Sequence, residues 1–216
     1  MLTHIDTLMF DLDGTLVNSW PAMHKGILYT LDKMKLPPQS FDEVLAFGPK
    51  GMIDLWQRVL KTTDASVVDH AIGLYKEAFS DHLFREIVAF AGVADVLDHF
   101  RGKRKIVVTN GLADLSWQIL THVALDRYID DLVGGDDIGC VKPMACPLDK
   151  GMDRLDGGAR DALMVGDMVV DVEAGRAAGV HTCAVTYGIG TLEELKVAGP
   201  DFIISDIREL KNIVAI

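Results

Sequence analysis

The chain has 216 residues, 49% of them hydrophobic and 25% charged, which fits one large domain, or a core with a small insertion, around a sizeable buried interior. Thirty-two acidic and 21 basic residues give a net charge of −11, which repels nucleic-acid backbones and anionic lipid surfaces. We therefore expect no nucleic-acid partner and no membrane partner. A small anionic substrate stays compatible with this charge if a metal ion and local cations reverse the sign within one site.

The three cysteines, Cys140, Cys146 and Cys183, are odd in number and form no C-x-x-C pair, so we expect reduced thiols. The first ten residues lack a basic leader and carry Asp6 ahead of any apolar run, unlike a signal peptide. No stretch approaches 18 consecutive apolar residues. These features predict a cytoplasmic protein. We expect it to be either a monomer or a homodimer.

Short apolar runs rich in β-forming residues alternate with amphipathic segments, which is typical of a doubly wound parallel sheet in an α/β fold. The predicted strands are Leu8–Phe10, Ile106–Val108, Leu132–Val133, Ala162–Val165, Cys183–Val185 and Phe202–Ile204. The predicted helices of this Rossmann-like core are Val93–Phe100, Leu112–His122, Leu148–Leu155, Val169–Ala178 and Ile207–Ile213.

The segment between Phe10 and Ile106 contains no comparable strand and far exceeds the dozen or so residues that a crossover needs. Apolar spacing near 3.6 predicts helices within it, interrupted by Pro and Gly at two breaks, one of which is Phe47–Gly51. The predicted helices are Ala22–Met34, Met52–Lys61 and Ala65–Arg85. We expect residues 17–87 to form a small all-helical subdomain, inserted in a core of residues 1–16 and 88–216.

Two acidic side chains, Asp11 and Asp13, directly follow the first predicted strand. Ligands of open parallel sheets bind beyond the carboxyl ends of the strands, and alternation places these two side chains on the same side. Such a pair can act as nucleophile and general acid/base. A calcium loop does not fit, because its Gly and Glu belong at positions six and twelve, whereas Gly14 is fourth and Ala22 twelfth. A solvated turn stays open.

Polar residues also follow three later strands. The run Thr109–Gly111 offers a hydroxyl, an amide and backbone N–H groups that could bind an anion or cap a helix. Lys142 supplies a cation after the third predicted strand, although an isolated lysine is usually a surface charge. Asp167 and Asp171 share one face of a following helix, where acids can also stabilise the helix dipole.

Taken together, D-x-D-G-T-L, a strand ending in Thr-Asn, then Lys-Pro, then Gly-Asp-x-x-x-Asp occur in one order, each after an apolar run. This combination resembles the haloacid dehalogenase superfamily of phosphohydrolases, from Asp6 to Leu210. The helical insertion is similar to the C1 cap of that family, and the chain is most similar to the group of phosphoglycolate phosphatase and β-phosphoglucomutase.

The resemblance implies that Asp11 attacks phosphorus to give an aspartyl-phosphate, and that Asp13 protonates the leaving alcohol and then activates water. It also implies that Thr109 hydrogen-bonds the transferring phosphoryl group, that Asn110 helps to orient it, and that Lys142 neutralises it. Positioning and charge neutralisation are what phosphoryl transfer requires.

The resemblance further implies a Mg²⁺ ion bound by the Asp11 carboxylate, the Asp13 carbonyl oxygen and Asp167, with Asp171 in or near the coordination sphere. Mg²⁺ prefers a few carboxylates, with waters and substrate oxygens completing an octahedron. Without a cation, clustered acids would repel one another and the substrate.

Departures from the family pattern refine this expectation. Dehalogenases lack the second acid of the motif. Asp13 supplies that acid here, and its presence favours a phosphate substrate. The histidine typical of mutases, twelve residues after the nucleophile, is replaced by Met23, with His24 one residue later, which does not favour a mutase. Asn18 and Met168 replace an Asp and a Ser that are usual beside the site.

The break Phe47–Gly51 is similar in position to the substrate-specificity loop of the family, where Gly48 would allow close backbone approach and Lys50 would meet an anionic group. A solvated lysine in a turn is an equal alternative. The leading expectation is a phosphatase for a small phosphorylated metabolite resembling phosphoglycolate. The alternatives are a pyrophosphatase or nucleotidase, a phosphomutase, and a non-catalytic phosphoacceptor or acidic binding module.

Overall fold

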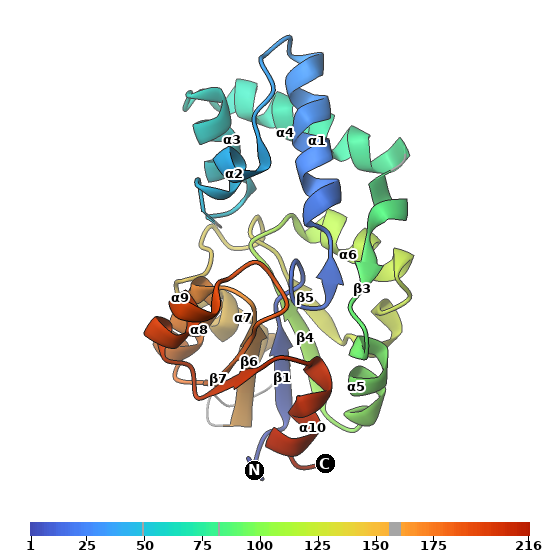
Figure 1. The fold of residues 1–216 in the computed structure, drawn as a ribbon, viewed down its shortest axis with the longest axis vertical. Helices are drawn as coiled ribbons and strands as arrows, with labels where there is room; N and C mark the ends of the chain where they lie inside the picture. Colours follow the sequence, from blue (N-terminus) through green and yellow to red (C-terminus); the bar gives the residue numbers. More distant parts are fainter. Residues whose placement is uncertain (49, 82, 156–160) are drawn as a thin grey trace.

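The computed structural model describes residues 1–48, 50–81, 83–155 and 161–216 (Figure 1). Within these ranges, six parallel strands form one sheet in the order β5-β4-β1-β6-β7-β8. They are β1 (Thr7–Phe10), β4 (Arg104–Val108), β5 (Asp131–Val133), β6 (Ala162–Gly166), β7 (His181–Val185) and β8 (Phe202–Ile204). The predicted α/β fold with a doubly wound parallel sheet is confirmed, and each predicted strand lies within an observed one.

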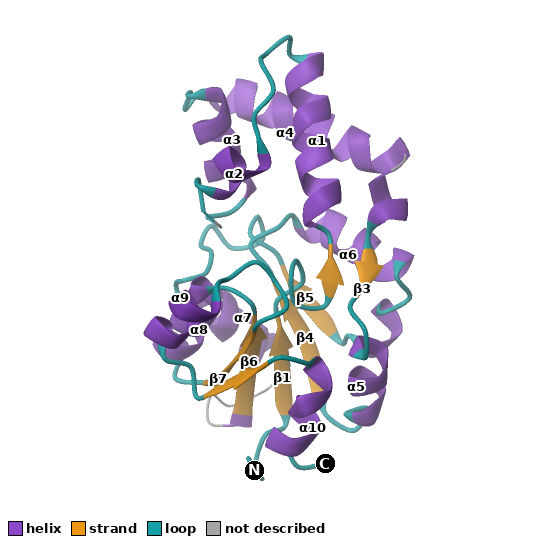
Figure 2. Ribbon diagram, in the orientation of Figure 1, coloured by secondary structure: helices purple, strands orange, loops and turns teal. Residues whose placement is uncertain are grey.

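Both faces of the sheet are covered, which explains why its strands are almost entirely apolar. Leu8 and Phe10 of β1 join one hydrophobic cluster, whereas Met9 joins the other. Figure 2 shows the sheet between its helices. The first cluster includes residues of α5 (Val93–His99), α6 (Ala113–His122) and α10 (Leu210–Ile213), and the second includes residues of α7 (Cys146–Arg154) and α8 (Val169–Ala178).

The ends of the core helices follow local sequence signals in part. Gly179 ends α8 in the left-handed conformation, with φ of 71°, as the sequence predicts. Past it, α9 (Leu192–Ala198) begins with a capping box made by Thr191 and Glu194. The predicted helix Ile207–Ile213 is instead a 3₁₀ turn, η4 (Ile207–Glu209), followed by the short α10.

The insertion lies above the sheet in Figure 1, over the ends of the strands that carry the polar residues. Three of its helices match the prediction. A fourth, α2 (Phe41–Leu45), was not predicted, and Ser40 and Glu43 form a capping box at its start. The insertion contains α1 (Trp20–Lys33), α2 (Phe41–Leu45), α3 (Met52–Leu60), α4 (Ala65–Asp81) and the 3₁₀ turn η1 (Leu83–Glu86).

The chain leaves and re-enters the core through two short antiparallel strands, β2 (Val17–Asn18) and β3 (Val88–Ala89). They lie at the boundaries that the sequence predicts for the insertion. The division into a core of 1–16 and 88–216 and a cap of 17–87 stays a prediction. Pro49 and His82, within the predicted loop and helix, lie outside the described residues.

The expectation that all three cysteines are reduced is wrong for two of them. Cys140 and Cys146 form a disulfide, with Cα atoms 6.6 Å apart, and Cys183 is free and buried in β7. The loop before α7 folds back so that Cys146, the first residue of that helix, lies beside Cys140, which their spacing of six residues does not reveal. None of the helices in the described ranges is both long and apolar enough to cross a membrane.

Because β1 lies in the middle of the sheet, we expect its buried side chains to contribute strongly to the unfolding free energy. Leu8 is fully buried in the larger cluster, so Leu8→Ala removes contacts that the packed interior cannot replace, and we expect a loss of about 2 to 5 kcal/mol in unfolding free energy. Val197 is 89% exposed, and Val197→Ala should change that free energy by less than about 0.5 kcal/mol. Urea unfolding followed by circular dichroism measures both, and equal effects would contradict the assignment of the core.

Candidate active site

The polar residues predicted from the sequence meet at the carboxyl end of the sheet. Asp11 follows β1, Thr109 follows β4 and Asp167 follows β6, and the register pairs Phe10 with both Val107 and Val165. Three functional side chains therefore emerge from three adjacent strands. Strand β1 lies where the strand order changes direction, which is where open α/β sheets bind ligands.

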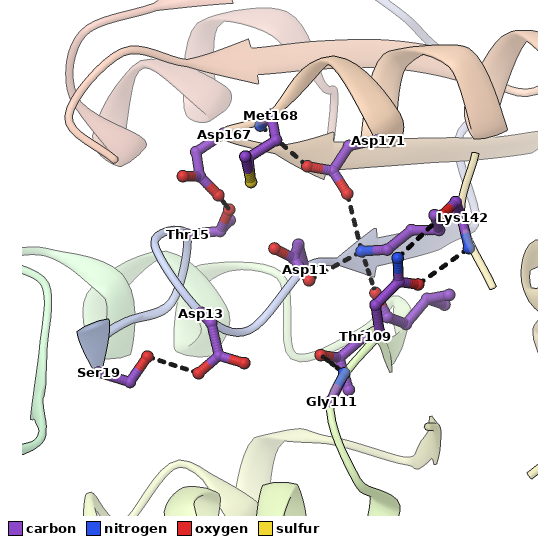
Figure 3. A network of polar contacts seen from close by, with 12 residues as sticks. Asp11, Asp13, Thr15, Ser19, Thr109, Gly111, Lys142, Asp167, Met168 and Asp171 are labelled. Carbon is purple, nitrogen blue, oxygen red and sulfur yellow. Dashed lines mark hydrogen bonds and ion pairs between the residues drawn. The ribbon is translucent and has the colours of Figure 1, made fainter. Parts of the chain in front are cut away.

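Lys142 is the buried cation of this site (Figure 3). Its Nζ donates hydrogen bonds to Asp11 Oδ1 at 2.8 Å and to the Val108 carbonyl oxygen at 2.6 Å, and it forms an ion pair with Asp171 Oδ1 at 2.7 Å. Burial lowers the pKa of Lys142, but the Asp11 and Asp171 carboxylates raise it by more. Lys142 is therefore a permanent positive charge.

Asn110 fixes the backbone that carries this lysine. Its Nδ2 donates to the Lys142 carbonyl oxygen at 2.8 Å, and its Oδ1 accepts from the Lys142 N–H at 2.9 Å. The side chain predicted to orient the substrate thus clamps the loop of Lys142 against the end of β4. Its contact with substrate stays a prediction.

Three buried carboxylates lie together beside Lys142. Asp11, Asp167 and Asp171 each offer an oxygen, and these oxygens lie within 4.8 Å of one another. Burial, together with repulsion from Asp171 and the other acids, holds the pKa of Asp11 well above its usual range, although Lys142 opposes the shift. Burial and Asp171 likewise raise the pKa of Asp167 to about 7. One lysine does not balance these acids, so the cluster suits a divalent cation with a preference for oxygen.

Asp167 is held from two sides. Thr15 Oγ1 donates to its Oδ1 at 3.0 Å, and the Ile189 N–H donates to its Oδ2 at 2.8 Å. A Cβ on Gly188 would lie 2.2 Å from Asp167 Oδ2, so glycine is required there for the loop after β7 to reach the carboxylate. Tyr187 supports the arrangement, because its hydroxyl donates to the Thr15 carbonyl oxygen at 2.8 Å.

Asp13 stands apart from the buried triangle. It is half-buried and lines a cavity between the sheet and the insertion. It accepts a hydrogen bond of 2.5 Å from the Ser19 hydroxyl. Burial raises its pKa, and the Ser19 hydrogen bond and Lys142 oppose that rise. A carboxyl group that faces a cavity can donate a proton when protonated and accept one when ionised.

The predicted anion cradle follows β4. Thr109 is buried, and its Oγ1 accepts from the Gly111 N–H at 3.0 Å. Both residues line the same cavity as Asp11 and Lys142. The structure thus brings the hydroxyl and the following backbone beside the buried charges.

A cavity open to solvent separates these charges from the helices of the insertion. Gly48 of the predicted specificity loop lines it, whereas the exposed Lys50 is not among its lining residues. His24 also lines it, and its Nε2 lies 2.9 Å from the Gln39 carbonyl oxygen. The substrate roles of Gly48 and Lys50 stay predictions.

Several contributors were not predicted from the sequence. Ser19 and Thr15 carry a recognisable signal, since they lie within a few residues of Asp13, but their partners depend on the fold. The Ile189 N–H has no signal at all. Of the two departures from the family pattern, Asn18 is exposed, and the Met168 N–H donates to Asp171 Oδ2 at 3.0 Å, which keeps Asp171 in place without a serine side chain.

Comparison with known proteins shows to which family the chain belongs. Residues 8–185 match the family model of haloacid dehalogenase-like hydrolases. A phosphoglycolate phosphatase of Cupriavidus necator is 33% identical over 96% of this chain and 92% of its own. The pyrophosphatase PpaX of Halalkalibacterium halodurans is 28% identical over 98% of both chains.

Solved structures show the same architecture. A predicted phosphatase from Clostridium acetobutylicum is 28% identical, with a TM-score of 0.83 over 97% of this chain and 98% of its own. A predicted phosphoglycolate phosphatase from Haemophilus somnus shares the fold with a TM-score of 0.88 over 97% of this chain and 98% of its own, at 24% identity. The chain belongs to the haloacid dehalogenase-like hydrolases, and it is an enzyme of that family.

The raised pKa values predict how stability depends on pH when divalent ions are removed. Asp167 titrates near 7 in the folded chain but near 3.9 when unfolded, so the folded state binds more protons between these values. In EDTA, the unfolding free energy should therefore fall as pH rises from about 4 to about 7. Urea midpoints at pH 5 and 7.5 measure this, Asp167→Asn should weaken the trend, and a rise in stability across this window would contradict the charge cluster.

The close approach of Gly188 to Asp167 makes a second prediction. Gly188→Ala must displace the Asp167 carboxylate. We expect the affinity of the variant protein for Mg²⁺ to be about 10- to 100-fold lower, as when a group supporting a metal ligand is lost. Gly102 is the control, because a Cβ there meets no atom within 4 Å. Calorimetric titration with Mg²⁺ compares Gly188→Ala with Gly102→Ala, and unchanged affinity in both would argue against Asp167 as a ligand.

Proposed function

We propose that the protein is a Mg²⁺-dependent phosphatase that hydrolyses a small phosphate ester through an aspartyl-phosphate on Asp11. The observation that carries this proposal is the buried ion pair of Asp11 and Lys142, 2.8 Å long, within a triangle of carboxylates at the end of β1. A buried lysine in contact with a nucleophilic carboxylate can neutralise the equatorial oxygens of a transferring phosphoryl group.

In the first step, an Asp11 carboxylate oxygen attacks phosphorus, and the bond to the leaving oxygen breaks while Asp13 donates a proton to that oxygen. In the second step, Asp13 takes a proton from water, which attacks the same phosphorus and releases inorganic phosphate and the Asp11 carboxylate. The raised pKa of Asp13, caused mainly by burial, suits both roles. Lys142 and the Thr109 hydroxyl hold the phosphoryl group throughout.

Asp11, Asp167 and Asp171, with the Asp13 carbonyl oxygen, are the groups that we propose to hold Mg²⁺. The oxygen-only donor set and the raised pKa values of Asp11 and Asp167 support this choice. When bound, the ion supplies positive charge that lets the carboxylates and a phosphate dianion approach one another. Thr15 and Ile189 orient Asp167 for this purpose.

The relatives suggest two substrate types, since one is named a phosphoglycolate phosphatase and another a pyrophosphatase. Phosphoglycolate is the leading candidate from the sequence, and pyrophosphate or a nucleotide is the alternative. The catalytic residues serve all of them equally, because they contact the phosphoryl group. A cytoplasmic location and a monomeric or homodimeric state belong to the same proposal.

Replacing the nucleophile tests the mechanism. Asp11→Asn cannot form the acyl phosphate, so release of phosphate from para-nitrophenyl phosphate with Mg²⁺ should fall to background. Asp13→Asn should lose about 10²- to 10⁴-fold in kcat, the usual contribution of general acid–base catalysis. A malachite-green assay of released phosphate measures both.

Asp6→Asn is the control for these variants, since Asp6 is exposed at the opposite end of β1. It should retain full activity, whereas EDTA should abolish the activity of the unmodified enzyme. Undiminished phosphate release by Asp11→Asn would disprove the mechanism.

A further inference from the structure

The cavity above Asp11 has a charged floor and apolar walls. The floor consists of Asp11, Asp13, Lys142 and Asp171, and the insertion supplies the walls. Eight apolar side chains among the described residues of the insertion line those walls: Trp20, Met23, Ile27, Phe41, Val44, Leu45, Met52 and Leu55. The cavity is open to solvent, and its walls lie where the group attached to the phosphate would be held.

The walls offer no cation for a second anionic group. Among the described residues that line the cavity, Lys142 is the single lysine or arginine. Its ammonium is already shared by Asp11, Asp171 and a backbone carbonyl. A carboxylate or second phosphate on the leaving group would lose its hydration among apolar side chains, with no charge to replace it.

His24 does not supply a group for a second anion, because its ring is already engaged by Gln39 and Phe41. Its Nε2 donates to the Gln39 carbonyl oxygen, and its ring meets Phe41 edge-on with centroids 5.5 Å apart. Phe41 also meets Trp20 edge-on at 6.4 Å. These contacts form an aromatic corner, fixed by the capping box at the start of α2, that can pack against a ring or an alkyl chain.

We propose that the substrate is a phosphate monoester of an uncharged, apolar alcohol, with an aromatic ring or an alkyl chain of several carbons beside the phosphate. This inference rests on the proposed phosphatase function and narrows its substrate class. It places phosphoglycolate and pyrophosphate, whose leaving groups are small and charged, among the poor substrates. The phosphate occupies the floor, and the alcohol occupies the space between Trp20, Phe41 and Leu55.

A series of esters on the unmodified enzyme tests the proposal without any risk to folding. Methyl, butyl and hexyl phosphates have leaving alcohols of similar acidity, so differences in kcat/KM report the apolar contacts. We expect kcat/KM to rise about threefold to fourfold for each methylene that the cavity buries. Benzyl phosphate should exceed both phosphoglycolate and pyrophosphate. A flat series, or a preference for either anionic substrate, overturns the proposal.

A pair of variants on one helix locates the effect. Leu55→Lys places a cation in the cavity wall and should lower kcat/KM for benzyl phosphate by about tenfold while raising it for phosphoglycolate. Ile53, also on α3, is 52% exposed and is not a lining residue. Ile53→Lys should change neither value by more than about twofold. Equal effects of the two variants would overturn the proposal.

Lys50→Ala separates the two substrate classes. The proposal fails if the unmodified enzyme prefers phosphoglycolate and Lys50→Ala raises the KM for that substrate, because Lys50 would then bind the anionic group. If the proposal holds, phosphoglycolate is a poor substrate before and after the change.

A binding measurement distinguishes failure of this inference from failure of the phosphatase mechanism. Benzylphosphonate cannot be hydrolysed, and calorimetry with Mg²⁺ should show that it binds more tightly than phosphonoacetate. If it does so while no ester releases phosphate, the mechanism is wrong and the apolar cavity stands. If phosphonoacetate binds more tightly, the apolar class is wrong whatever the activity.

Discussion

Lys142 partly neutralises the carboxylates that meet at the carboxyl end of the sheet. Asp11, Asp167 and Asp171 offer oxygens within 4.8 Å of one another in a buried place, where repulsion between carboxylates is strong because water does not screen it. The ammonium contacts Asp11 and Asp171 directly, and Asn110 fixes the loop that carries it. The remaining negative charge makes the cluster suitable for a divalent cation.

Two parts of the chain line the cavity. The sheet supplies the charged floor, whose residues would contact the phosphate under the proposed function. The insertion supplies the apolar walls, which would contact the leaving group. In that proposal the walls take no part in the chemistry, so they can change without loss of catalysis. Members of one family can therefore differ in their substrates, as the names phosphoglycolate phosphatase and pyrophosphatase indicate for two relatives.

Prediction from the sequence succeeded where one local pattern had one structural outcome. Apolar strands covered on both faces, such as Leu8–Phe10, and long amphipathic helices, such as Val169–Ala178, were found in place. Helix α2 was missed because it has five residues and depends on the capping box of Ser40. The pairing of β2 with β3 was missed because strands of two residues show no alternation. The disulfide of Cys140 was missed because only the fold of its loop brings Cys146 near.

The sequence by itself determined the order of the strands along the chain, the residues at their carboxyl ends and the family to which the chain belongs, because those features are local and carry their own chemistry. Only the tertiary structure decided that Asn110 hydrogen-bonds the backbone of Lys142 and that the loop of Gly188 contacts Asp167. It also decided that Lys50 is not among the residues lining a cavity whose apolar walls come from three helices. Each of these depends on groups far apart in the chain meeting in space, and no spacing of residues records such a meeting.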